Sequence, residues 1–175
     1  EVPLSVQQLT GETLQNFAVN DANDLGVVTP GLTVTRVLGN TSPYIRGIGT
    51  ASPLTGVEPA VAMYIDGVYQ PAAAANIFAF NNIASVEILK GPQGTLYGRN
   101  ATGGLINVIT KDPSFDPQAE VKLGYGDYDT TTANLYGTMG FGDRVAADIA
   151  VYYNDQNEGF GRNLTLDREF HTEEE

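Results

Sequence analysis

Residues 85–110 read SVEILKGPQGTLYGRNATGGLINVIT, and this stretch decides the fold of the chain. It begins and ends with mostly β-branched and aliphatic residues, at positions 86–89 and 105–109, which strands prefer. One proline and five glycines lie between these two runs, and such residues permit sharp changes of direction at low steric cost. We therefore expect two short buried strands joined by a compact, glycine-rich connection.

The chain has the composition of a folded domain. Its 175 residues are 42% hydrophobic and include 20 glycines, which excludes a disordered tail and allows one globular domain and a little more. The net charge of −12 is uneven: residues 1–112 hold 8 acidic and 5 basic groups, giving −3, and residues 113–175 hold 13 and 4, giving −9. Because no basic footprint for DNA or RNA is present, nucleic acid is not expected as a partner.

The side-chain inventory argues against catalysis. The chain has no cysteine, which removes disulfides and thiolate metal sites, and His171 is the only histidine. Common zinc sites and histidine-based catalytic sites need more than this. We therefore expect no catalytic residues, no metal, no cofactor and no enzyme activity. No run approaches the roughly 18 apolar residues of a membrane helix. An outer-membrane strand would show no such run either, so this absence does not exclude a membrane.

The first part of the chain is predicted to be an α+β domain with a short mixed sheet, helical turns and many loops. Thr10 and Asp21 are placed to cap two short helices, the second ending before Pro30-Gly31. Asp66-Gly67 predicts a tight turn between two strands. Further short elements are expected as strands at residues 32–36, 44–46 and 60–65 and as a helical turn within residues 72–80.

After residues 111–113 the hydrophobic pattern changes to strict alternation, with a period of two residues. Three successive segments of about ten residues alternate apolar and polar side chains, with short connections between them, as transmembrane β-barrel strands do. These segments lie at residues 121–125, 132–141 and 145–154. A soluble antiparallel sheet with one solvated face has the same alternation, so this pattern by itself leaves both interpretations open.

Several motifs resemble the plug domain of TonB-dependent outer-membrane receptors. The strand ending in Lys90-Gly91-Pro92 resembles that family's "EVLRGP", and the next segments along the chain resemble "LYG" and "GGxINVIT". The other matching elements are YIRGIG at residues 44–49, AVAMYIDGVY at residues 60–69 and YGRNATGG at residues 97–104. The resemblance favours the barrel interpretation of the later strands. It divides the chain into a plug at residues 1–112 and the first strands of an incomplete barrel at residues 113–175.

The resemblance implies a function in transport across the outer membrane of a Gram-negative bacterium. A plug of this family fills the pore of a large barrel until energy delivered by TonB rearranges it. The implied partners are TonB, through an upstream segment not seen here, the chain's own barrel, outer-membrane lipid and a scarce small-molecule substrate such as a ferric siderophore. The barrel is incomplete in this chain, so we expect an N-terminal fragment of a longer receptor or a truncated open reading frame.

The resemblance also implies site residues. Charged side chains of the plug are expected to lock it to the barrel wall, and these are Arg46, Glu87, Lys90 and Arg99. Lys90 stands where the family commonly has arginine, which keeps the charge but loses the planar fork. Substrate is expected at the plug apex, formed by the loops at residues 50–58 and 70–80. The apex residues singled out there are Thr50, Pro53, Tyr69, Phe78 and Phe80.

Two alternatives remain open at this point. The first is a stand-alone soluble plug-like module that binds a substrate or partner in the periplasm. The second is a fragment of a soluble β-rich hydrolase, against which the single histidine argues. The sequence does not select one substrate among siderophore, cobalamin and sugar.

Overall fold

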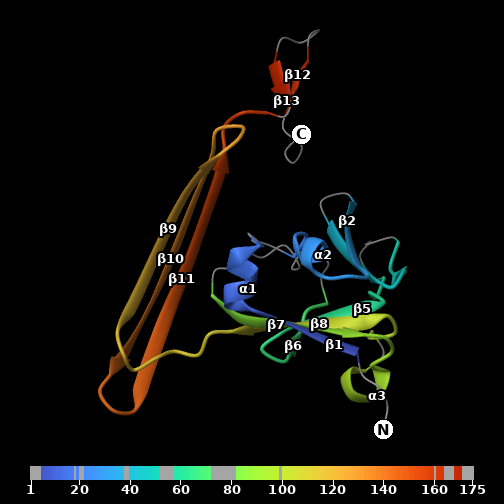
Figure 1. Cartoon of the computed structure of the whole chain (residues 1–175), viewed down its shortest axis with the longest axis horizontal. Helices are drawn as coiled ribbons and strands as arrows, with labels where there is room; N and C mark the ends of the chain where they lie inside the picture. Colours follow the sequence, from blue (N-terminus) through green and yellow to red (C-terminus); the bar gives the residue numbers. More distant parts are fainter. Residues whose placement is uncertain are drawn as a thin grey trace. The chain divides into compact units, whose positions relative to one another are not determined.

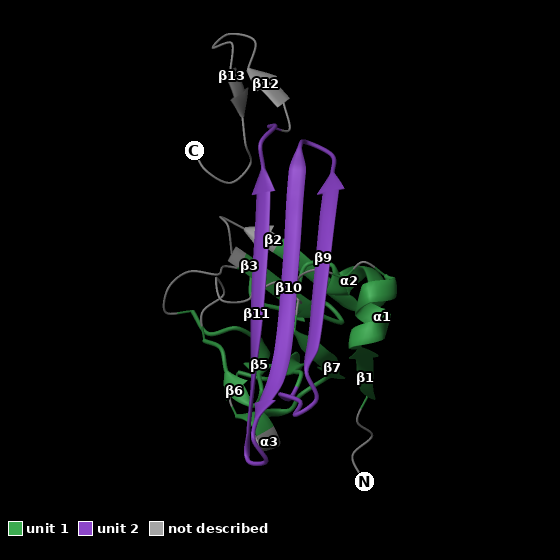
Figure 2. Cartoon of the chain, turned by 90° about the vertical axis from the view of Figure 1, so that its left-hand side faces the viewer, with its two compact units in different colours: residues 1–111 green, residues 112–175 purple. Residues whose placement is uncertain are grey.

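The computed structural model describes residues 5–17, 19, 22–37, 40–51, 57–71, 82–98, 100–159, 161–163 and 168–170. The chain divides into two compact units, residues 1–111 and residues 112–175 (Figure 2). The division lies one residue before the boundary that the sequence predicted. Each unit is described by itself.

The first unit is built on a mixed five-stranded sheet (Figure 1). Its strands, in spatial order, are β1 (Ser5–Thr10), β7 (Ile83–Lys90), β8 (Gly104–Thr110), β5 (Val61–Ile65) and β6 (Val68–Tyr69). The β5–β8 pair is parallel, and the other three pairs are antiparallel. Strands β7 and β8 are the two expected from the opening stretch, and they lie next to each other near the middle of the sheet. The predicted mixed sheet is thereby confirmed.

The residues of this sheet alternate between two separate hydrophobic clusters. The larger cluster takes Val86, Ile88, Ile106 and Val108 from the central strands and packs them against the helices and the second sheet. The smaller cluster takes Leu89 and Leu105 from the opposite face, with Ala62 and Ala101. Both clusters are almost fully buried. The near-continuous apolar runs of the sequence therefore reflect strands that are covered on both faces.

The larger cluster is covered by two helices and a three-stranded sheet, which lie on one face of the main sheet, while a third helix lies on the other (Figure 1). These elements are α1 (Gly11–Asn16), α2 (Leu25–Val28), β2 (Leu32–Val37), β3 (Asn40–Ile45), β4 (Ile48–Gly49) and α3 (Gly94–Tyr97). Among the described residues, none of the helices has the length and apolar character needed to cross a membrane.

The first helix begins as predicted, whereas the second begins differently. The Thr10 side chain accepts a hydrogen bond from the Thr13 backbone N–H at 3.2 Å, which caps α1. Asp24 occupies the N-cap position of α2 without a side-chain cap, and Asp21 lies outside the described residues. Residues 94–97 form one helical turn, α3, where only a glycine-rich loop was expected. The expected helical turn within residues 72–80 lies outside the described residues.

Two tight turns of the first unit place two consecutive residues at positive φ, as type I′ hairpin turns require. Asp66 and Gly67 have φ of 48° and 77° between β5 and β6, which confirms the predicted turn. The Asp66 carboxylate also accepts hydrogen bonds from the backbone N–H and the hydroxyl of Thr110, at 2.9 and 2.8 Å. Asp66 therefore fastens the end of β8 as well as forming a turn.

The second such turn joins β3 to β4. Arg46 and Gly47 have φ of 52° and 79° there. The sequence predicted Arg46 to end a strand, but β3 ends at Ile45. The left-handed conformation of Arg46 is uncommon for a residue with a side chain. The turn sets this exposed arginine apart from the strands on either side.

The second unit contains a three-stranded antiparallel meander, drawn as three long strands in Figure 2. The strands are β9 (Gln118–Gly126), β10 (Thr130–Phe141) and β11 (Val145–Gln156). Their register pairs Leu135 with both Val121 and Val151, so apolar residues share one face. The three predicted segments are confirmed as strands. A short hairpin comes next, β12 (Gly161–Asn163) and β13 (Arg168–Phe170), which the sequence analysis did not predict.

The polar face of the meander holds the segment that enters β9. The Ser114 backbone N–H donates to the Thr138 hydroxyl oxygen at 2.8 Å, and the Gly140 N–H donates to the Phe115 carbonyl at 3.2 Å. A Cβ atom at Gly140 would lie 2.9 Å from that carbonyl. Glycine at this position therefore allows the segment to lie close against β10.

Replacing Gly104 by alanine is expected to destabilise the first unit by roughly 2–5 kcal/mol, because it adds backbone strain and overpacking. Gly104 has φ of +142°, and a Cβ atom there would lie 2.8 Å from the Cδ1 of Ile45, which is fully buried. The free energy of unfolding, from urea titration of the 175-residue chain followed by circular dichroism, measures the effect.

Gly94→Ala is the matched control for this prediction. A Cβ atom at Gly94 has no atom within 4 Å, and Gly94 has no positive φ. The control should change the free energy of unfolding by less than about 0.5 kcal/mol. Equal effects of the two substitutions would contradict the close packing of β8.

Candidate functional site

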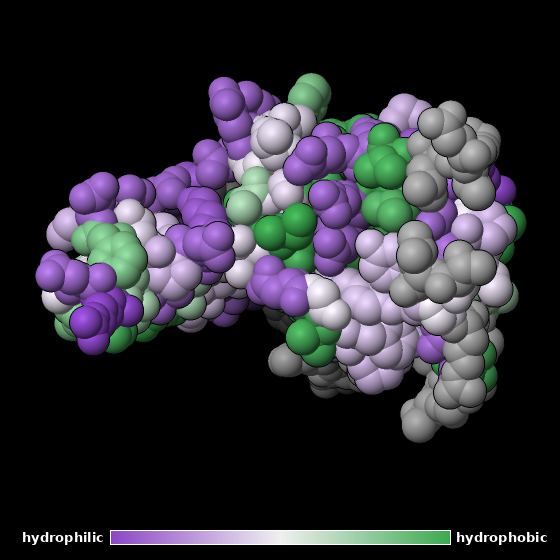
Figure 3. Space-filling view, turned by 90° about the horizontal axis from the view of Figure 1, so that it is seen from below, coloured by the Kyte–Doolittle hydropathy of each residue, from purple (hydrophilic) through white to green (hydrophobic). Residues whose placement is uncertain are grey.

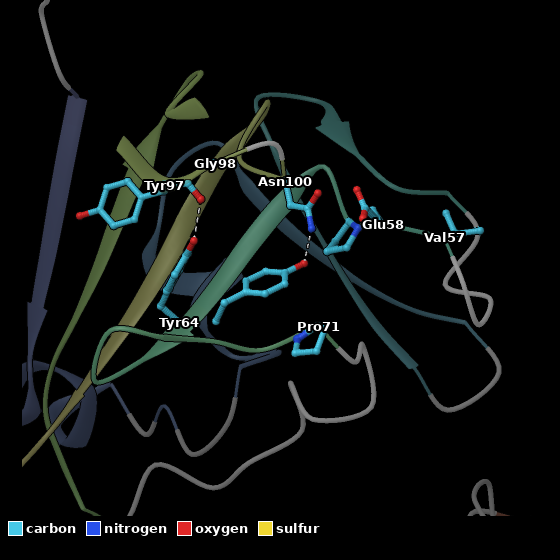
Figure 4. A pocket seen from close by; sticks show the side chains of 9 residues that line it. Val57, Glu58, Tyr64, Pro71, Tyr97, Gly98 and Asn100 are labelled. Carbon is cyan, nitrogen blue, oxygen red and sulfur yellow. Dashed lines mark hydrogen bonds between the residues drawn. The ribbon is translucent and has the colours of Figure 1, made fainter. Parts of the chain in front are cut away.

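A pocket opens beside the outer strands of the main sheet. Its volume is about 580 Å³. The lining combines three tyrosines and two prolines with small and polar side chains (Figure 4). The lining residues are Val57, Glu58, Pro59, Tyr64, Tyr69, Pro71, Tyr97, Gly98 and Asn100. The size and the mixture of flat apolar surface with a few polar groups are those of a small-molecule site.

Tyr64 organises the aromatic side of the pocket. Its ring centroid lies 5.6 Å from that of Tyr69 and 5.4 Å from that of Tyr97, the second pair edge to face. These separations are favourable for aromatic pairs. The Tyr64 hydroxyl donates a hydrogen bond to the Tyr97 backbone carbonyl at 2.7 Å, drawn as a dashed line in Figure 4. Strand β5 and helix α3 are joined by this contact across the pocket wall.

A second hydrogen bond joins the edge strand to the loop after α3. The Asn100 side-chain amide donates to the Tyr69 hydroxyl oxygen at 2.6 Å. The register pairs Tyr69 with Tyr64, so both rings leave the same face of the sheet. Figure 4 shows Tyr64 and Tyr97 toward one side of the pocket and Glu58 and Val57 toward the other. Segments far apart in the sequence therefore meet in one pocket.

The same sheet face carries a polar row that leads away from the pocket. Tyr64 on β5 pairs with Asn107 on β8, which pairs with Glu87 on β7. The Asn107 side-chain amide donates to the Glu87 carboxylate at 3.2 Å. Glu87 therefore lies two strands from the tyrosines, with Asn107 between them. This arrangement connects a predicted locking residue to the candidate site through hydrogen-bonded and paired neighbours.

The predicted apex residues divide into those that the structure describes and those that it does not. Tyr69 lines the pocket. The Thr50 hydroxyl oxygen accepts from the Ala60 backbone N–H at 2.7 Å, which holds the segment that leads into the pocket wall. Pro53, Phe78 and Phe80 lie outside the described residues.

Of the predicted locking residues that the structure describes, none is among the residues that line the pocket. Arg46 is exposed, in the turn between β3 and β4. The Lys90 ammonium donates to the Gln7 side-chain oxygen at 2.9 Å and to the Pro30 carbonyl at 2.7 Å. These bonds fasten the end of β7 to β1 and to the turn after α2. Arg99 lies outside the described residues, and pairing with a barrel stays a prediction for all four.

Sequence reasoning did not single out Tyr64, Tyr97 and Asn100 as site residues. Each lies in a motif that the sequence analysis quoted for its resemblance to a known family, AVAMYIDGVY for Tyr64 and YGRNATGG for the other two. One signal could have pointed to a tyrosine-lined site. Each of the three motifs YIRGIG, AVAMYIDGVY and YGRNATGG contains at least one tyrosine. Their convergence depends on the parallel pairing of β5 with β8, which no local pattern reveals.

The site has the chemistry of binding. Its tyrosines and asparagine offer hydrogen bonds and ring surfaces. Within the part of the chain that the structure describes, no group of three or more metal-ligating side chains comes together. Burial raises the pKa of the Tyr64 hydroxyl above its ordinary value, and the neighbouring Tyr69 and Tyr97 add to this. Tyr64 therefore stays a neutral hydrogen-bond donor at physiological pH.

Tyr64→Phe is expected to reduce the alkaline sensitivity of the fold. Because the pKa of Tyr64 is raised in the folded state, its stabilising effect is present below about pH 10 and is lost as pH rises through the folded value. The free energy of unfolding, measured at pH 8 and pH 11, should fall less in the variant than in the wild type.

The same variant has an expected effect at pH 8. Losing the bond to the Tyr97 carbonyl should cost up to about 1 kcal/mol, since a single neutral hydrogen bond contributes about that much. An unchanged alkaline sensitivity would show that Tyr64 does not titrate as a partly buried group.

Comparison with known proteins gives a consistent result. The family described as TonB-dependent Receptor Plug Domain matches residues 1–105. The pesticin receptor of Yersinia pestis is 37% identical over 131 residues, covering 72% of this chain and 19% of the receptor. The ferripyoverdine receptor of Pseudomonas aeruginosa is 28% identical, covering 90% of this chain and 19% of that receptor. Both relatives are named as receptors.

A solved structure agrees with these relatives. The ferric yersiniabactin uptake receptor FyuA from Yersinia pestis superposes with a TM-score of 0.78 and 29% identity, over 85% of this chain and 24% of that one. The chain thus spans about a fifth of the length of the curated relatives and a quarter of this structure.

Proposed function

Since the chain belongs to the TonB-dependent receptor plug domain family, we propose that it gates and binds substrate for an active transporter. Its place is the outer membrane of a Gram-negative bacterium, as for the receptors that it matches. The proposed cargo is a scarce small molecule such as a ferric siderophore. The names of several relatives support this class, including a ferripyoverdine receptor and a ferric yersiniabactin uptake receptor.

The observation that carries this proposal is the combination of the two units. The mixed five-stranded sheet of residues 1–111 is followed by three strands whose apolar residues share one face. Leu123, Val121 and Ile149 on that face are 80%, 63% and 61% exposed. Exposed apolar side chains in a contiguous band are costly in water and favourable against lipid. We propose that this band faces the membrane.

The polar character of the surface supports the proposal that the first unit is a plug in a water-filled pore. On the face seen in Figure 3, hydrophobic residues lie in small groups separated by hydrophilic ones. A plug must be polar enough for a water-filled lumen and still hold its own hydrophobic core. The two buried clusters of the first unit supply that core.

Plug–barrel locking is proposed for Arg46, Glu87, Lys90 and Arg99. Arg46 fits this role best, because its side chain is exposed and its backbone is held in a left-handed conformation at a turn. Strained conformations of this kind concentrate at functional positions. Lys90 has a second role in holding β7, since its ammonium already donates to Gln7 and Pro30. TonB is the proposed energy-coupling partner, acting through a segment outside the described residues.

Leu135→Arg is expected to impair outer-membrane assembly, costing roughly 2–4 kcal/mol if the residue lies near the membrane midplane. Leu135 is 43% exposed on the apolar face of β10. The amount of heat-modifiable protein in outer-membrane fractions, detected by antibody against residues 1–112, measures assembly.

Asn134→Arg is the control, because Asn134 points to the opposite, polar face of the same strand. It should assemble normally. Equal assembly of both variants would favour a soluble sheet. A soluble periplasmic band near 18.6 kDa in the wild type would favour the stand-alone binding module instead.

Arg46→Ala in the receptor that carries this chain should increase the entry of antibiotics too large for porins, because a loosened plug no longer seals the pore. Growth inhibition by such an antibiotic measures the leak. Lys111→Ala, which changes a cation outside the four proposed locking residues, is the control. Unchanged permeability of the Arg46 variant would show that Arg46 is not needed to hold the plug against the barrel.

A further inference from the structure

The apolar face of the meander is hollowed over a set of small residues. Gly137 on β10 pairs with Ala119 on β9, and Ala147 on β11 lies one row further along the same face. Because glycine and alanine have little or no side chain, a hollow of about 520 Å³ opens over them. We call it the meander groove, and the residues that shape it are Ala119, Gly137, Met139, Phe141, Ala147 and Ile149.

Larger apolar side chains stand around this floor of small residues. Met139, Phe141 and Ile149 are all exposed. Within a membrane, hydrocarbon surrounds every residue of such a face, so apolar character by itself selects no particular molecule. Shape is what the groove adds, because a hydrocarbon chain lying in it makes dispersion contacts on more than one side. The meander groove therefore fits an acyl chain.

The groove ends beside a turn that has charges of both signs. Phe141 is the last residue of β10, and Asp143 and Arg144 lie in the turn that follows it. Asp116 comes shortly before β9 begins, at the same end of the meander (Figure 2). All three charged residues are exposed. A molecule whose hydrocarbon chain lies in the groove can therefore place a polar end next to a guanidinium and carboxylates.

These charges distinguish between classes of lipid headgroup. Arg144 attracts a phosphate, whereas the carboxylates of Asp143 and Asp116 attract an ammonium group. A zwitterionic phospholipid such as phosphatidylethanolamine has both groups in one headgroup. The anionic headgroups of phosphatidylglycerol and lipopolysaccharide would be attracted by Arg144 and repelled by the two carboxylates. The charges at this end of the groove therefore favour the zwitterion.

We propose that the meander groove binds an acyl chain of a zwitterionic phospholipid, with the headgroup at the turn that contains Asp143 and Arg144. This proposal rests on the proposed function, because it requires the apolar face of the meander to lie in a membrane. It adds a selective lipid site to a face that otherwise needs only to be apolar. Ala119, Gly137 and Ala147 contribute to the site by being small.

The test uses the receptor that carries this chain, purified in micelles of an uncharged maltoside detergent. The probe is a phosphatidylethanolamine with a photoactivatable diazirine in one acyl chain, and mass spectrometry of peptides locates the label. We expect saturable labelling within residues 137–149 that unlabelled phosphatidylethanolamine prevents. Phosphatidylglycerol and diacylglycerol with the same acyl chains are the matched competitors. Each should compete at least about fivefold more weakly, the factor expected from one charge near a membrane surface.

Three variants separate the groove from the headgroup site. Ala147→Leu fills the groove and should weaken binding of the probe at least about fivefold. Ala133→Leu adds the same atoms on the same face, outside the groove, and should leave binding unchanged. Asp143→Asn should reduce the preference for phosphatidylethanolamine over phosphatidylglycerol by about fivefold. Heat-modifiable migration shows that each variant is folded, and if Ala147→Leu does not fold, Asp143→Asn decides.

Other results would overturn the proposal. Equal competition by all three lipids would show that the groove selects no headgroup, and stronger competition by phosphatidylglycerol or lipopolysaccharide would assign it to an anionic lipid. Equal labelling of the wild type and Ala147→Leu would place the probe outside the groove. A dimeric receptor without labelling would assign the groove to a second copy.

The failure of this inference is distinguishable from the failure of the proposed function. Absence of labelling in a receptor recovered from the outer membrane would refute the lipid site and leave the transport function intact. A soluble periplasmic band in the fractionation experiment would refute the transport function, and the lipid site with it.

Discussion

The antiparallel pairing of β7 with β8 is the interaction on which the rest of the first unit depends. These strands supply residues to both hydrophobic clusters, so losing their register would exchange the two faces and expose each core. Gly104 allows the pairing to start, because at its φ of +142° a side chain would run into the neighbouring strand and Ile45. Lys90 is the β7 residue that pairs with Gly104. Its ammonium donates hydrogen bonds to Gln7 and Pro30, which hold this end of β7 in place.

The pairing also positions the candidate site. Because β8 lies parallel to β5, the strand that carries Tyr64 is held beside α3, which ends at Tyr97, and beside the following loop, which carries Asn100. At the last residue of β8, Thr110 donates two hydrogen bonds to the Asp66 carboxylate in the turn between β5 and β6. The tyrosine pocket, the polar row through Asn107 and Glu87, and the end of β8 therefore belong to one hydrogen-bonded framework. A ligand in the pocket would contact this framework through Tyr64, Tyr69 and Asn100.

The second unit is governed by a different constraint. Its strands bury little on their apolar face, and Leu123 and Ile149 are mostly exposed. Its polar face instead receives the entering segment, which Thr138 and Gly140 hold through Ser114 and Phe115. The two faces of one meander thus have separate partners in the proposed transporter, lipid on one side and the interior on the other. This division is a direct result of the period of two.

The sequence by itself determined the local features whose causes are local. Alternation predicted the strands of the second unit, Thr10 predicted the cap of α1, and Asp66-Gly67 predicted a hairpin turn, because side-chain period and backbone sterics act within a few residues. Only the tertiary structure decided that Lys90 holds β1, that residues 94–97 form a helical turn, and that Tyr64, Tyr69 and Tyr97 share a pocket. These features depend on pairing between segments up to 83 residues apart. The free energy of such contacts comes from the assembled sheet, which no short stretch of sequence contains.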